Sequence, residues 1–163
     1  MSIQAVTIRR YQVSRGFKKD DLNPLIDDPN VSCIQFSSPL AEKEIDVLEE
    51  FVFSKRPDIG LRVFGHHGEE CDLRFLKRMP SLRNISADYL INAKGIEVVS
   101  EFKDLESLSV GIFELNNFDF LNEVNPNLKK LSLHQTRSTR PRIDAIGRLF
   151  NSKNFTSRHN QKA

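Results

Sequence analysis

Apolar residues recur along the chain in a short template, L-x-x-L-x-L, in which L stands for any apolar residue. Three segments follow it closely, and each begins 23 residues after the one before: Leu82–Ala87, Leu105–Val110 and Leu128–Leu133. Val31–Phe36 and Ile3–Ile8 have the same shape, whereas residues 59–64 are apolar with a blurred register. Alternating apolar and polar positions are typical of a half-buried strand. We therefore expect strands beginning near residues 3, 31, 59, 82, 105 and 128.

The segments between these strands predict short helices that end at a proline or a polar turn. Four prolines each stand two residues before a predicted strand, namely Pro29, Pro57, Pro80 and Pro126. Proline cannot continue a helix and sets an extended entry into the next strand. Upstream of them, apolar residues have helical spacing: Ile45/Leu48/Val52, Phe75/Leu76/Met79, Ile96/Val99/Phe102 and Phe118/Leu121/Val124. The connections are short for a doubly wound α/β domain, and the constant step favours stacked repeats.

With these motifs, residues 22–150 resemble the leucine-rich-repeat family, more loosely its 22–24-residue bacterial and internalin-like type. The resemblance implies an α/β solenoid with a parallel β-sheet on the concave face and short helices on the convex face. The family's usual asparagine after the last apolar position is replaced here by Leu90, Phe113 or Thr136. The missing asparagine ladder predicts an irregular solenoid, in which Asn116 and Asn117 do part of that work.

A single domain is expected over residues 1–155. Its ends are predicted to be a capping strand at about residues 1–10 and a degraded last repeat at about 141–155, where Ser152 and Phe155 stand in place of strand leucines. Residues 156–163 are polar and basic and are predicted to form a disordered tail.

The x positions of the template point away from the core and predict the binding face. Gln35, Ser86, Ser109 and Ser132 form a small, polar middle row, which a partner could approach closely. The candidate protein-binding residues are Gln35, Arg83, Ser86, Asp88, Tyr89, Glu106, Ser109, Lys129, Ser132 and His134.

Two sets of residues near this face have alternative interpretations. Arg83, Glu106 and Lys129 carry charges of both signs, which fits either partner recognition or cross-strand pairing for stability. Just past the strands, Tyr89, Leu90, Ile112 and Phe113 either anchor a partner or fold back to close the core.

The distribution of charge along the chain indicates which partners it could bind. The net charge is +2, but residues 20–128 carry −11 and residues 129–163 carry +8. A basic end fits a solvated tail, or contact with nucleic acid or an acidic protein through Lys129, Lys130, Arg137, Arg140, Arg142 and Arg148. An incomplete last repeat would also leave apolar edge surface for a homodimer. We expect a cytoplasmic chain without a membrane span, because no apolar run approaches about 18 residues.

The sequence supplies little material for catalysis or for a cofactor. Cys33 and Cys71 are not in a CxxC pair and are expected to be reduced, and no nucleophile or phosphate-binding motif is present. Residues 66–71 hold two histidines, two glutamates and a cysteine, but adjacent histidines on an extended segment point to opposite sides. A solvated turn is therefore favoured over a metal site. The expected function is non-enzymatic binding of another protein, with no cofactor.

Overall fold

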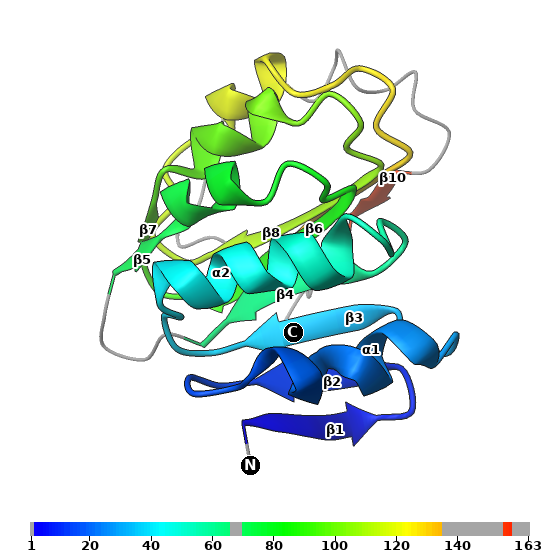
Figure 1. Ribbon diagram of the computed structural model, residues 1–163. Helices are drawn as coiled ribbons and strands as arrows, with labels where there is room; N and C mark the ends of the chain where they lie inside the picture. Colours follow the sequence, from blue (N-terminus) through cyan, green and yellow to red (C-terminus); the bar gives the residue numbers. More distant parts are fainter. Residues whose placement is uncertain (1, 66–69, 135–154, 158–163) are drawn as a thin grey trace.

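The computed structural model describes residues 2–65, 70–134 and 155–157. Eight of its strands form one sheet, in the order β1-β2-β3-β4-β6-β8-β9-β10 (Figure 1). Their bounds are β1 (Ile3–Thr7), β2 (Arg10–Val13), β3 (Cys33–Phe36), β4 (Gly60–Phe64), β6 (Asn84–Leu90), β8 (Ser107–Ile112), β9 (Lys130–Leu133) and β10 (Phe155–Ser157). The strands β1 and β2 pair antiparallel, and every later neighbour pairs parallel. The chain is therefore an α/β protein with a mostly parallel sheet, as predicted.

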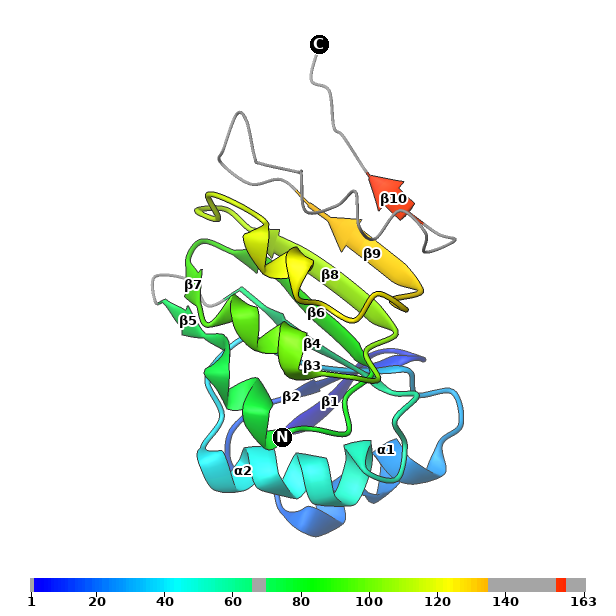
Figure 2. The same ribbon diagram turned by 90° about the horizontal axis from the view of Figure 1, so that it is seen from above.

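Short helical segments lie between the strands and pack together on one face of the sheet (Figure 2). They are η1 (Lys19–Leu22), α1 (Asn23–Asp27), α2 (Glu42–Leu48), the π-helical η2 (Glu49–Phe53), η3 (Leu73–Arg78), η4 (Ile96–Glu101) and η5 (Asp119–Asn122). The predicted helical segments are thus confirmed, but η3, η4 and η5 are 3-10 helices. A connection this short holds one or two turns, the length at which 3-10 geometry is common. A small second sheet pairs β5 (Cys71–Asp72) with β7 (Ala93–Lys94) beside them.

The apolar positions of the repeated template align across the sheet and form the core. Ile34 pairs with Leu61, which pairs with Ile85, and Leu108 and Leu131 continue the row. All five side chains are at most 2% exposed. Because successive side chains on a strand point to opposite faces, the residues between them point away from the helices.

The structure corrects the register at the N-terminus. The strand β1 is an edge strand, as expected of a cap, but it runs antiparallel and does not follow the parallel repeat. The first parallel strand is β2, in which Tyr11 pairs with Ile34. The strand predicted near residue 3 is therefore present, but it does not belong to the parallel series.

At the other end, β10 places Phe155 beside Leu131, the position that the last repeat predicted for it. Thr156 and Ser157, the first two residues of the predicted tail, belong to this strand. The rest of the predicted tail and residues 141–154 of the last repeat lie outside the described residues. None of the helices formed by the described residues has both the length and the apolar character needed to cross a membrane.

Asn117, one of the two residues predicted to replace the asparagine ladder, makes a local hydrogen bond within its own turn. Asn117 Oδ1 accepts a hydrogen bond from the Asp119 backbone N–H at 3.1 Å, at the start of η5. Leu90 occupies its ladder position as a core residue, 1% exposed. At the position of the family's asparagine after β6, the chain therefore places an apolar core residue.

Candidate functional site

The face of the sheet opposite the helices carries two rows of aligned residues. Strand register defines a first row, which contains Arg10, Cys33, Gly60, Asn84, Ser107 and Lys130. It also defines a central row, which contains Gln12, Gln35, Arg62, Ser86, Ser109 and Ser132. No described helix covers these rows (Figure 2).

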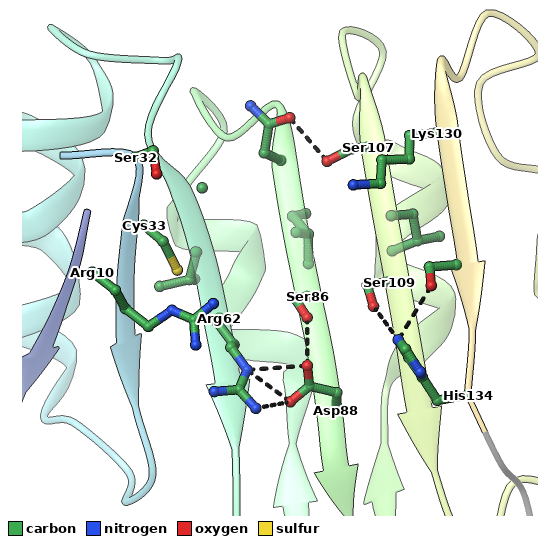
Figure 3. Close-up of a pocket in the computed structure, with 16 residues that line it drawn as sticks. Arg10, Ser32, Cys33, Arg62, Ser86, Asp88, Ser107, Ser109, Lys130 and His134 are labelled. Atoms are coloured by element: carbon green, nitrogen blue, oxygen red, sulfur yellow. Dashed lines mark hydrogen bonds and ion pairs between the residues drawn. The ribbon is translucent and has the colours of Figure 1, made fainter. Parts of the chain in front are cut away.

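A hollow of about 450 Å³ lies over these rows and spans six strands, from Arg10 on β2 to Lys130 on β9 (Figure 3). The base of the hollow is shallow because many of its residues, such as Gly60 and Ser109, have a short side chain or none. A Cβ atom on Gly60 would lie 3.2 Å from Asn84 Cβ, and one on Gly111 would lie 3.1 Å from His134 Cβ. A larger residue at Gly60 would therefore crowd Asn84 and fill part of the hollow, and one at Gly111 would crowd His134.

A chain of hydrogen bonds crosses four strands at the floor of this face. Gln35 Nε2 donates to Gln12 Oε1 at 3.0 Å, and Arg62 Nη1 donates to Gln35 Oε1 at 3.0 Å. Arg62 then pairs with Asp88, with Nη2 2.7 Å from Oδ1, and Ser86 Oγ donates to Asp88 Oδ2 at 3.0 Å. The Arg62 and Asp88 side chains are only 16% and 12% exposed. A buried ion pair with its remaining hydrogen bonds made holds both groups in one geometry.

Aromatic side chains stand beside this ion pair. The Arg62 guanidinium lies 4.4 Å from the centre of the Phe64 ring and 5.8 Å from that of Tyr89. Tyr89 is 77% exposed and has a φ of 52°, in the left-handed region that bulky residues rarely adopt. The fold thus holds a large aromatic side chain in solvent in a backbone conformation that costs energy.

His134 lies between two serines at the far side of the hollow. Its Nε2 atom is 3.2 Å from both Ser109 Oγ and Ser132 Oγ (Figure 3). A serine nucleophile also needs a carboxylate that orients the imidazole and an oxyanion hole. Among the described residues, no carboxylate is hydrogen-bonded to His134, whose ring contacts are the two serines.

The two cysteines are free and have different surroundings. Burial raises the pKa of the Cys71 thiol to about 12, and burial also raises the pKa of Cys33, although the nearby Arg10 opposes that shift. Cys33 lines the hollow and is partly exposed, whereas Cys71 is 1% exposed.

We therefore expect one thiol to react slowly in the folded chain and the other not at all. A thiolate is the reactive form, and a pKa near 12 leaves about one Cys71 in 10,000 ionised at pH 8. Labelling with iodoacetamide, followed by mass spectrometry of the peptides, should modify Cys33 first and Cys71 only after denaturant is added. Equal labelling of both cysteines without denaturant would contradict the packing around Cys71.

Most of the predicted binding residues lie on this face. Ser86, Asp88, Ser109, Ser132 and His134 line the hollow. Gln35 belongs to the same row but is 4% exposed and serves to hold Arg62.

The charged candidates lie beyond the hollow and interact with one another. Glu106 is 3.0 Å from Lys129 and 4.0 Å from Arg83. The sequence analysis left open whether these charges recognise a partner or pair with one another across strands. The contacts agree with the pairing. The apolar candidates divide: Leu90 and Ile112 are buried in the core, whereas Tyr89 and Phe113 are 77% and 45% exposed.

Several residues of the site were not among the predicted binding residues, among them Arg10, Gln12 and Arg62. The first two lie on β2, whose place in the parallel register was not recognised. Arg62 lies in the segment with a blurred register, where Leu61 and Val63 fill the core positions. Aligning Leu61 with Ile34 and Ile85 would have placed Arg62 between Gln35 and Ser86.

The other candidates for chemistry are described only in part. Of residues 66–71, Glu70 forms an ion pair with Lys94 at 2.7 Å and Cys71 is buried. His66, His67 and Glu69 lie outside the described residues, and so do Thr136, Arg137, Arg140, Arg142 and Arg148. In the part of the chain that the structure describes, no group of three or more His, Cys, Asp or Glu side chains could hold a metal ion.

Comparison of the sequence with the models of known protein families gives no match, and comparison with curated proteins gives none either.

Proposed function

We propose that the chain is a short leucine-rich-repeat solenoid that works as a non-enzymatic binding module for another protein. The aligned apolar positions support the repeat, as do hydrogen bonds between equivalent residues 23 apart, Gln12 with Gln35 and Asn84 with Ser107. The observation that carries the binding function is the hollow on the uncovered face, to which six neighbouring strands contribute side chains.

The character of this face favours a macromolecule over a small molecule. The hollow is open to solvent along the sheet, whereas pockets for small ligands enclose most of the ligand surface. Tyr89 is exposed and lies beside Arg62, which lines the hollow, and Ile91 and Phe113, which follow the ends of β6 and β8, are exposed too. Aromatic and aliphatic anchors beside a polar region are typical of protein interfaces.

Replacing Ser109 with arginine tests this proposal, because Ser109 lies in the hollow and its side chain is short. An arginine there would fill the hollow, and we expect S109R to weaken retention of a protein partner by roughly tenfold or more. The measurement is quantitative mass spectrometry of proteins retained from a lysate of the source cells, with equal amounts of bait.

The matched control is S54R, which adds the same side chain at an exposed serine after η2. A partner that S54R and the unaltered chain retain, and that S109R loses, supports the proposal. Equal retention by S109R and S54R would place the interface elsewhere and overturn it. Thermal unfolding of all three proteins checks that neither arginine disrupts the fold.

A further inference from the structure

Positive charge gathers in the hollow and is only partly compensated by an acid. Three basic residues line it, Arg10, Arg62 and Lys130, and the acid that lines it is Asp88. Asp88 is already paired with Arg62. Among the described residues, no carboxylate lies within ion-pair distance of Arg10 or Lys130. On the helical face, acids and bases pair with one another, as Glu42 and Asp46 of α2 do with Arg78 of η3.

The two uncompensated cations mark the ends of the first row. Arg10 lies on β2 and Lys130 on β9, with four uncharged residues of the intervening strands between them. Five strand spacings of about 4.8 Å separate their backbones by about 24 Å. Between these ends, Gly60 and Ser107 have no side chain or a short one, so little of the row rises above the backbone of the sheet. The arrangement is a shallow track across the strands with a positive charge at each end.

Hydrogen-bond donors line the middle of this track. Ser107 Oγ donates to Asn84 Oδ1 at 2.9 Å, which fixes the amide so that its Nδ2 hydrogens are left to donate elsewhere. The Arg10 and Lys130 side chains are donors without acceptor capacity. A ligand that matches the track must therefore offer oxygen acceptors along its length and negative charge near its ends.

We propose that the first row binds an acidic segment of the protein partner, laid in extended form across the strands, with carboxylates at Arg10 and Lys130. An extended chain advances about 3.3 Å per residue, so about seven residues span the track. Backbone carbonyls supply acceptors for Asn84, and side-chain carboxylates supply the charge. Single-stranded nucleic acid fits less well, because it binds through stacking on aromatic side chains and the first row contains none.

This inference rests on the proposed function, since it names the chemistry recognised at the same face. Its test uses a fluorescein-labelled heptamer of glutamate and measures anisotropy with the full chain at physiological ionic strength. A lysine heptamer and a labelled oligothymidylate are the comparison probes. The test variant is R10Q/K130Q, and the control K43Q/K103Q removes two positive charges outside the hollow, on α2 and after η4.

We expect the glutamate heptamer to bind the unaltered chain and K43Q/K103Q alike, and R10Q/K130Q roughly tenfold more weakly. Equal weakening by both double variants would mean that net charge alone attracts the peptide, and would overturn the site. Tighter binding of oligothymidylate than of the glutamate heptamer would replace the acidic segment with nucleic acid. If the glutamate heptamer does not bind, the inference that the first row takes an acidic segment is overturned. The proposed function is tested separately, because loss of the partner in S109R would still show that the uncovered face of the sheet binds a protein.

Discussion

Replacing Phe36 with alanine should lower the free energy of unfolding by about 4 kcal/mol, because truncation of a fully packed phenylalanine removes apolar burial and leaves a cavity. Phe36 ends β3, is 2% exposed, and has its ring centre 5.6 Å from that of Phe75 on η3. It therefore joins the sheet to the helical layer. Urea unfolding followed by circular dichroism measures the change as a shift of the midpoint at constant slope.

The control for this prediction is Phe113→Ala, which removes the same side chain at a position that is 45% exposed. We expect it to cost less than about 1 kcal/mol, because much of that ring is already in water. A loss of less than about 1 kcal/mol in Phe36→Ala, no larger than in the control, would show that Phe36 is not a stabilising part of the core.

The inward-facing positions of the sheet were predictable from the sequence, and the reason is physical. Residues such as Leu108 and Leu131 must be buried at equivalent places in stacked strands, so their spacing is set by geometry and repeats along the chain. The uncovered face has no such constraint, and its polar residues vary. The apolar template nevertheless predicted the place of Ser86, Ser109 and Ser132, because side chains alternate along a strand.

Arg62 shows what the sequence could not reveal. The segment around Arg62 has apolar residues at Ile59, Leu61, Val63 and Phe64. Because Val63 and Phe64 are adjacent, the sequence alone does not decide which alternate residues face the core. A shift of one residue would turn Arg62 into the core. Pairing with both neighbouring strands decides the phase. The ion pair with Asp88 then depends on side-chain reach between strands, which no spacing within one segment encodes.

The antiparallel direction of β1 could not be predicted for a different reason. Ile3–Ile8 alternates apolar and polar residues as a strand should, but alternation does not tell a parallel strand from an antiparallel one. Val6 and Ile8 are 51% and 76% exposed, so the apolar positions here do not enter the core. The reversal between β1 and β2 is a tight hairpin in which Thr7 pairs with Arg10. Tyr11 and Val13 carry the core positions instead.

Replacing Asp88 with alanine should lower the free energy of unfolding by about 3 kcal/mol, because it leaves the charge of Arg62 in a largely buried place without its carboxylate. Asp88 accepts from Arg62 Nε at 2.8 Å and from Ser86 Oγ, so both donors lose their acceptor. Gln35 Oε1 remains as an acceptor for Arg62. Chemical unfolding measures the loss, and cross-strand order at this face should decrease with it.

A double-mutant cycle separates the ion pair from simple loss of packing. In R62A/D88A neither charge is left alone, so we expect the double variant to lose about 2 kcal/mol less than R62A and D88A together. Additive losses would mean that the two groups act independently. The hydrogen bonds from Gln12 to Ser86 would then not be what holds the side chains at the base of the hollow in one geometry. If coupling is found, the pair does more than stabilise the sheet. It holds the aromatic rings of Phe64 and Tyr89 beside a fixed guanidinium, so the shape of the proposed binding face depends on it.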